Sequence, residues 1–372
     1  MRATTPLPLD GFTVLDLSTL LPGPYCTTLL QTYGARIIKV ETPAGDPVRK
    51  MSPAFFSQFN RGKASVVIDL KTDEGRRNLI RLAKQADALI EGFRPGVMAR
   101  LGVGYDAMSA ENPAIVYCSL SGFGQSGPYR DRPAHDLNFL GLAGYYSIPS
   151  QIDGAISRPN VRMADLVAGQ TAAMAMAMAM ISARQSGSGA HLDCSIYDSV
   201  AHWSIPLILA NNGAASQDPA DYSLVMADSG LFATRDGRYI SLGTLEDKFW
   251  AALVEAIGHV EPRLNDDKWS TRRGRDSNKR ELHDILTSCF LKKDRSEWAL
   301  ILDDIETAWG LVYQGGEVLQ DNHLVARELI STEGGEVCAY PVRFSGQRPP
   351  APGPVRDLGA DTDEILAALP VE

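Results

Sequence analysis

Two residues whose side chains can exchange protons near neutral pH, His135 and Asp165, lie 30 residues apart, each beside a largely apolar, helix-forming stretch. A histidine and a carboxylate can both be tuned toward neutral pH by burial and by neighbouring groups. Facing one substrate carbon, they would suit removal of a proton from one side and its return from the other. The same residues would also suit a buried ion pair or two helix caps, so taken alone they favour neither interpretation.

The segments that must position this pair alternate between apolar strands and helices. Strands at residues 12–17 and 36–41 flank a helix-compatible stretch, and Pro22-Gly23-Pro24 is expected to break the chain before that helix. Further strands are predicted at 65–70, 88–91 and 115–120, with helices at 73–85 and 96–101. This alternation favours an α/β fold with a mostly parallel sheet and helices on its faces. Helical character then dominates from residue 136 to 184.

The second half of the chain has a different pattern. Two strands, 231–235 and 239–242, flank Asp236-Gly237-Arg238, which predicts a hairpin. Helices are expected at 247–257, 278–291 and 295–305, so this region resembles a smaller α+β domain. A proline-rich connector at 348–354 precedes a short helix at 362–369.

Composition limits the classes of function. The 372 residues are 44% hydrophobic and 22% charged, which is ordinary for a globular protein of two or three domains. A net charge of −9 argues against nucleic acid or an anionic membrane as partner. The five cysteines are scattered without metal-binding spacing, so reduced thiols and no metal site are expected. The longest apolar run, 172–181, is about half a membrane span. We therefore expect a soluble cytoplasmic protein.

Alternating methionines occupy residues 174–180. On a helix, Met174 and Met178 share one face, whereas Met176 and Met180 share another. One interpretation is an adaptable core helix. The other is a polarizable surface for a variable acyl chain, which thioether side chains suit.

Several motifs together resemble one family. They are residues 20–24 (LLPGP), 33–41 (YGARIIKVE), 91–98 (EGFRPGVM), 119–128 (SLSGFGQSGP), 191–198 (HLDCSIYD) and 358–366 (LGADTDEIL). The resemblance is to the class III CoA-transferase and α-methylacyl-CoA racemase family. It covers most of the chain, is dense in the first 200 residues and is weak from about 263 to 330.

This resemblance implies a domain organisation. A Rossmann-like large domain is expected at residues 1–200, rejoined by 330–372, with a smaller α+β domain at 222–320 and linkers at 201–221 and 321–329. Family members form interlocked homodimers in which the site lies between the large domain of one subunit and the small domain of its partner. The implied ligand is an acyl-CoA thioester, with no further cofactor.

The resemblance also suggests roles for individual residues. Asp165 matches an aspartate that is a nucleophile in the transferases and an acid/base group in the racemases. The pair His135-Asp136 is similar to the racemase motif, and the N–H of Asp136 is the candidate donor to the enolate oxygen. Glu246 matches the racemase glutamate that orients the histidine, although by itself it would also suit a helix N-terminus. The glycine-rich loop of formyl-CoA-type transferases has no counterpart between residues 221 and 263.

Four cationic residues are candidates for the CoA phosphates. Lys39 and Arg94 match positions where the family places cations, and Arg61 and Lys63 lie in a short basic segment nearby. Solvated surface charges are the alternative interpretation of each. The predicted function is epimerisation of a 2-methylacyl-CoA-type thioester. A CoA-transferase acting through an Asp165 acyl-enzyme is the alternative, and an inactive CoA-binding protein is a third hypothesis.

Overall fold

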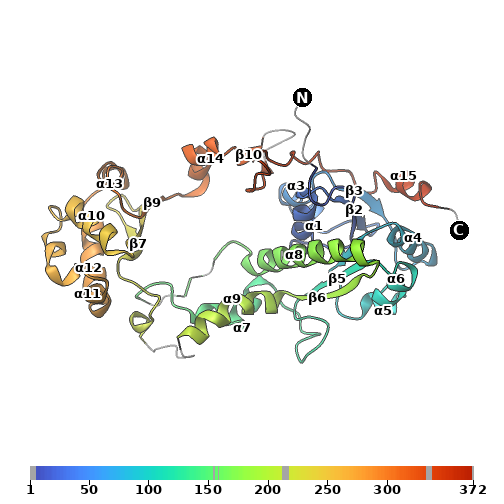
Figure 1. The fold of residues 1–372 in the computed structure, drawn as a ribbon, viewed down its shortest axis with the longest axis horizontal. Coiled ribbons are helices and arrows are strands. Elements are labelled where there is room, and N and C mark those ends of the chain that lie inside the picture. The colour runs from blue at the N-terminus through green and yellow to red at the C-terminus, as the bar shows by residue number, and fades with distance from the viewer. Residues whose placement is uncertain (1–5, 154–155, 158, 212–217, 332–336, 371–372) are drawn as a thin grey trace. The chain divides into compact units, whose positions relative to one another are not determined.

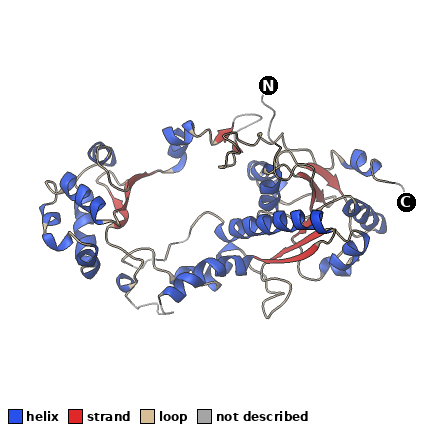
Figure 2. Ribbon diagram, in the orientation of Figure 1, coloured by secondary structure: helices blue, strands red, loops and turns tan. Residues whose placement is uncertain are grey.

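The computed structural model describes residues 6–153, 156–157, 159–211, 218–331 and 337–370, which fold into two compact units (Figures 1 and 2). The first unit comprises Met1–Tyr145, Pro159–Ser204 and His323–Glu372. The second comprises Tyr146–Arg158 and Ile205–Asn322. The chain therefore passes from one unit to the other four times.

A six-stranded parallel sheet forms the centre of the first unit, in the order β3-β2-β1-β4-β5-β6. The direction in which strands are added reverses between β1 and β4, as in doubly wound sheets, which bind ligands at this point. The strands are β1 (Thr13–Asp16), β2 (Arg36–Glu41), β3 (Ala64–Val67), β4 (Ala88–Glu91), β5 (Val116–Ser121) and β6 (Ala190–Ser195). The predicted α/β class with a parallel sheet is confirmed.

Helices join these strands and bury the apolar faces of the sheet. The longest, α8 (Met163–Ser186), packs on α1 (Pro22–Thr32) and on the last two strands (Figure 1). The other helices of this unit are α2 (Val48–Met51), α3 (Pro53–Asn60), α4 (Asp73–Lys84), α5 (Val97–Arg100), α6 (Tyr105–Glu111), α7 (Asp136–Leu142) and α15 (Thr362–Ala367). Short strands β10 (Ile330–Ser331) and β11 (Val337–Cys338) pair antiparallel.

The second unit combines an antiparallel sheet of β7 (Ser229–Ala233), β8 (Tyr239–Gly243) and β9 (Trp309–Val312) with a group of helices. These are α10 (Asp247–Ile257), α11 (Arg272–Ser277), α12 (Lys279–Phe290) and α13 (Arg295–Leu302). Trp250, Trp269 and Trp298 are buried in its core. Two helices, α9 (Ile196–Ala210) and α14 (Asn322–Ala326), contain two of the four boundaries between the units.

The continuous helical region predicted at residues 136–184 is wrong. Helix α7 ends at Leu142, and Gly144 follows with φ +77°, a conformation that favours glycine and ends a helix. Tyr146–Arg158 then belongs to the second unit, where Ile152 is buried in the apolar core. The predicted large domain is therefore interrupted between its two candidate acid/base residues.

The predicted break at Pro22-Gly23-Pro24 is also wrong. Helix α1 begins at Pro22 itself, because proline at the first helical position lacks an N–H that would have no partner there and has a fixed φ that suits the helix.

The methionine run has two faces, as predicted. Met176 and Met180 are buried, and Met176 lies against Cys26, with the two sulfur atoms 3.8 Å apart. Met174 and Met178 are exposed. Helix α8 is long and apolar enough to cross a membrane, by length and composition alone. Its buried face packs on α1 and the sheet, as expected of a core helix in a globular unit.

Candidate active site

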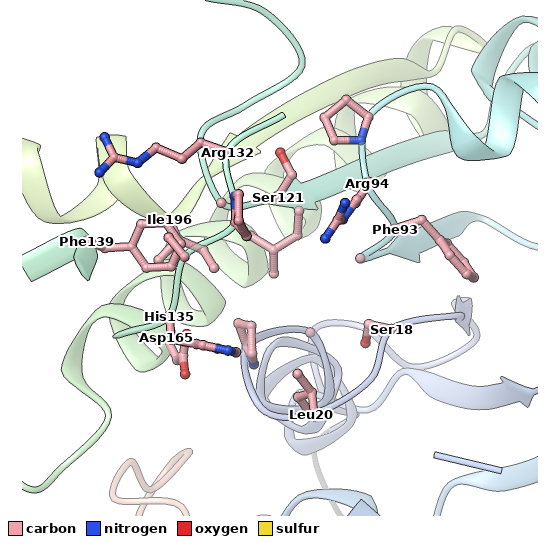
Figure 3. Close-up of a pocket in the computed structure, with 18 of the residues that line it drawn as sticks. Ser18, Leu20, Phe93, Arg94, Ser121, Arg132, His135, Phe139, Asp165 and Ile196 are labelled. Carbon is pink, nitrogen blue, oxygen red and sulfur yellow. The ribbon is translucent and has the colours of Figure 1, made fainter. Parts of the chain in front are cut away.

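A cavity of about 480 Å³ opens at the carboxyl ends of β1, β4 and β5, where the strand order reverses (Figure 3). The ends of these strands and the loops that follow them form one side, contributing Ser18–Leu20, Gly92–Pro95 and Leu120–Gly122. Residues 130–135 with Asn138, Phe139, Asp165 and Ile196 form much of the remainder. This is the ligand-binding position of doubly wound sheets.

The cavity brings together His135 and Asp165, which the chain separates by an excursion into the second unit (Figure 3). His135 immediately precedes α7, and Asp165 lies in the first turn of α8. Asp136 connects the two helices, since its buried Oδ1 accepts hydrogen bonds from the N–H groups of Ala164 at 2.8 Å and Asp165 at 3.4 Å. This carboxylate therefore caps α8 from the start of α7.

The electrostatic surroundings of Asp165 favour its neutral form. Burial, and after it the negative charge of Asp136, raise the pKa of its carboxyl group to a net value of about 6. Arg162 and His135 oppose these effects. A carboxyl group that titrates near pH 6 can accept a proton and return it at neutral pH.

Catalysis is expected to weaken below pH 6 in the direction in which Asp165 removes a proton or attacks a thioester, because its carboxyl group must then be ionised. We expect kcat/KM to fall about tenfold per pH unit as the pH decreases below about 6, in keeping with one essential base. A pH–rate profile between pH 4.5 and 8 checks this. A constant kcat/KM down to pH 4.5 would assign an ordinary carboxyl group instead.

His135 presents its side chain at an exposed position, and its backbone N–H donates to Asn138 Oδ1 at 3.0 Å. The following residue, Asp136, occupies the first helical position, where the backbone N–H has no acceptor within the helix. This N–H is thus available to an oxygen atom of a ligand beside His135.

Glu246 precedes α10 in the second unit, where its side chain is exposed. The neighbouring Asp247 is held by Arg275, whose Nη2 donates to it at 2.8 Å. Glu246 makes no ion pair or side-chain hydrogen bond with any residue that the structure describes. Its carboxylate is therefore available, and its pairing with His135 stays a prediction.

Lys39 and Lys63 lie outside the cavity lining and are almost completely buried. Lys63 Nζ donates to Thr27 Oγ1 at 2.7 Å and to the Pro24 carbonyl at 2.9 Å, and it lies 3.2 Å from Asp16 Oδ2. Burial lowers the pKa of Lys63 to about 8, although Asp16 opposes this. These ammonium groups already bind acceptors of the protein, which argues against the predicted role in phosphate binding.

The arginines are placed differently. Arg61 is buried and does not line the cavity, whereas Arg94 is exposed and lines it (Figure 3). Arg130 and Arg132 also line the cavity and were not predicted as site residues. The basic segment YRDRP, just before His135, is the feature of the sequence that could have indicated these two arginines as site residues. Among the described residues, no three His, Cys, Asp or Glu side chains are grouped to hold a metal ion.

A close helix contact holds Asp165 in place. A Cβ atom on Gly169, one turn after Asp165 on α8, would lie 2.5 Å from the Pro22 carbonyl oxygen at the start of α1. Only glycine allows this approach, because real Cβ contacts are never so short.

Gly169→Ala is expected to destabilise the protein by about 1–3 kcal/mol, as overpacking typically does, and to lower kcat by moving Asp165. Urea unfolding and a kinetic assay check both effects. Gly141→Ala on α7 is the matched control, since a Cβ there meets nothing within 4 Å and should be neutral or slightly stabilising. Wild-type kcat in Gly169→Ala would show that this contact does not position Asp165.

The fold and the cavity define an α/β protein with a histidine and an aspartate side by side at the switch point of a doubly wound sheet. The chain belongs to the family described as CoA-transferase family III, whose model matches residues 9–362. Its relatives include enzymes of two reaction types. It is 31% identical to the succinyl-CoA–D-citramalate CoA-transferase of Chloroflexus aurantiacus, over 87% of this chain and 83% of that one. It is also 31% identical to the α-methylacyl-CoA racemase of Homo sapiens, over 96% of this chain and 92% of that one.

Solved structures agree with the fold. A CaiB/BaiF family protein from Brucella suis is similar with a TM-score of 0.85 and 28% identity, covering 98% of this chain and all of that one. The family assignment made from the motifs is confirmed. Since the relatives include both a racemase and transferases, family membership leaves the reaction type open.

Proposed function

We propose that the protein epimerises the α-carbon of a 2-methylacyl-CoA-type thioester through two bases. The observation that carries this proposal is the pair of helix starts at one cavity, with His135 before α7, Asp165 in the first turn of α8 and the Asp136 carboxylate joining them. The absence of a glycine-rich loop from the sequence between residues 221 and 263 also favours a racemase over a formyl-CoA-type transferase.

The reaction requires stabilisation of an enolate. One base, either the His135 imidazole or the Asp165 carboxylate, takes the α-proton. The electron pair of the C–H bond forms the carbon–carbon double bond of the enolate, and the π pair of the carbonyl moves onto the thioester oxygen. The N–H of Asp136 and the positive potential of the α7 N-terminus stabilise that oxygen. The protonated form of the other base then returns a proton to the opposite face of the carbon. A pKa of about 6 for Asp165 suits both directions.

Arg94 is proposed to bind a phosphate group of the CoA moiety, with Arg130 and Arg132 as further cations at the same cavity. We infer from the family resemblance that Glu246 orients His135 and that the enzyme acts as a homodimer. Glu246→Gln is then expected to weaken catalysis more than CoA binding.

The second candidate is a CoA-transferase in which Asp165 attacks the thioester and forms an acyl-enzyme. It is favoured by relatives named as CoA-transferases at the same identity as the racemase.

Incubation of a single-epimer 2-methylacyl-CoA in deuterium oxide, with and without a second carboxylic acid, distinguishes the two. Loss of configuration with deuterium at the α-carbon is expected. Transfer of CoA to the added acid without α-deuteration would overturn the epimerase proposal in favour of the transferase.

A further inference from the structure

The loop between β1 and α1, residues 17–21, lies on a buried group of four charges. Asp16 and Asp46 carry the negative charges, and Lys39 and Lys63 carry the positive ones, with side chains at most 2% exposed. Apolar side chains of similar size usually stabilise a protein as well as buried ion pairs do. Stability alone therefore does not account for these charges.

Asp16 binds the loop directly. Its Oδ1 accepts hydrogen bonds from the backbone N–H of Ser18 at 3.0 Å and from Ser18 Oγ at 2.5 Å. Its Oδ2 accepts a hydrogen bond from Thr27 Oγ1 at 2.6 Å, on α1. One carboxylate thus connects the end of β1 to both the loop and the helix that follows it.

The two lysines bind one backbone carbonyl in the loop and one in the first turn of α1. Lys39 Nζ donates to the Ser18 carbonyl at 3.0 Å, and Lys63 Nζ donates to the Pro24 carbonyl at 2.9 Å. An apolar side chain at Lys39 would leave the Ser18 carbonyl without this donor, whereas the Pro24 carbonyl also accepts from Thr28 Oγ1 at 2.8 Å.

The segment they hold is strained and faces the cavity. Leu20 has φ +65°, a left-handed conformation that is rare for a residue with a Cβ atom and persists only where the surroundings impose it. Ser18, Thr19 and Leu20 all line the cavity, and Leu20 is 46% exposed. Gly23 allows the loop to pack closely on α1, because a Cβ atom at this position would lie 2.1 Å from Ser18 Oγ.

We propose that Asp16, Lys39 and Lys63 are positioning residues for the acyl-CoA, fixing the 17–21 loop in its strained conformation so that the cavity is formed before the ligand binds. This inference rests on the proposed function of the cavity. The lysines act on the ligand through the loop and touch no phosphate.

The test removes the charges in pairs. The variant Asp16→Asn/Lys63→Met is expected to remain folded, because no unpaired charge is created between these two residues, but to bind an acyl-CoA at least tenfold more weakly by calorimetry. The control Glu41→Gln/Arg49→Met removes a neighbouring ion pair of the same unit, at 2.6 Å, whose members do not line the cavity. It should lose comparable stability in urea and keep wild-type affinity.

The outcomes separate the two proposals. Wild-type protein that binds no acyl-CoA would overturn the proposed function itself. A folded double variant with wild-type affinity, or equal loss of affinity in the control, would overturn the positioning role alone. Amide hydrogen exchange of the wild-type protein gives an answer even if both variants unfold. Slow exchange of the Ser18 N–H, which donates to Asp16 Oδ1, before acetyl-CoA is added supports a preformed loop, and fast exchange that slows only with ligand contradicts it.

Discussion

Replacing Asp165 by Asn is expected to lower kcat about 10³-fold or more. The amide can neither accept the α-proton nor attack a thioester, and general acid–base groups contribute about 10²–10⁴-fold to rates. The loss should occur in epimerisation and in CoA transfer alike, so this variant tests the site rather than the reaction type. Steady-state kinetics with an acyl-CoA at saturation gives the measurement. Retention of more than a tenth of wild-type kcat would remove Asp165 from the mechanism.

The same variant should be more stable than the wild type at neutral pH. The folded-state pKa of about 6 lies well above the value of 3.8 that is usual for an aspartate, so the native state binds the proton more tightly. Ionised Asp165 therefore destabilises the fold above pH 6, by at most about 3 kcal/mol and, since the group is partly exposed, by about 1–2 kcal/mol. Urea unfolding should show the gain at pH 7.5 and its disappearance near pH 4.

A matched control is Asp106→Asn, which changes an exposed aspartate in the first turn of α6. Because it lies outside the cavity lining, we expect wild-type kcat and a change in stability below about 0.5 kcal/mol. A stability gain in this control as large as that in Asp165→Asn would show that the gain does not come from the site.

Replacing His135 by Gln is expected to lower epimerisation about 10²–10⁴-fold while leaving one half-reaction intact. Asp165 still removes the proton of the epimer that faces it, so that epimer should exchange its α-hydrogen for deuterium without inversion. The other epimer should neither exchange nor invert. Mass spectrometry and chiral chromatography on each pure epimer in deuterium oxide give the two rates.

His202→Gln is the control for this experiment, since His202 is exposed on α9 and does not line the cavity. It should behave as the wild type with both epimers. Equal exchange of both epimers in His135→Gln would contradict the assignment of His135 as a base. Undiminished CoA transfer by the same variant would favour the transferase hypothesis.

Much of the fold could be predicted because the strands of a parallel sheet are buried on both faces and stand out as apolar runs. The ranges 36–41 and 88–91 agree with β2 and β4, and the range 247–257 agrees with α10. Strand β6 was missed, because the alternating residues of AHLDCS expose His191 and Asp193 at the edge of the sheet. The passage of residues 146–158 into the second unit depends on tertiary packing of Ile152, which local sequence does not encode.

The site was predictable to the extent that it depends on residue type. His135 and Asp165 stand out as titratable groups beside apolar helices, and the structure places both at one cavity. The sequence does not show whether the ammonium group of a lysine binds acceptors of the protein or faces a ligand, because that depends on its neighbours in the fold. Lys63 is held inside the protein, whereas Arg94 lies at the cavity, because Asp16, Thr27 and a backbone carbonyl lie within reach of the Lys63 ammonium group.

The four passages of the chain between the two units limit how the protein can be rebuilt. A chimera that exchanges only residues 205–322 for those of a relative would leave Ile152 to pack in a foreign core. The excursion that carries Ile152 starts four residues after α7 and ends five before α8, so a misfit there would act on the two helices that present His135 and Asp165. The second unit therefore cannot be exchanged as one continuous segment, and recombination must carry both of its segments together.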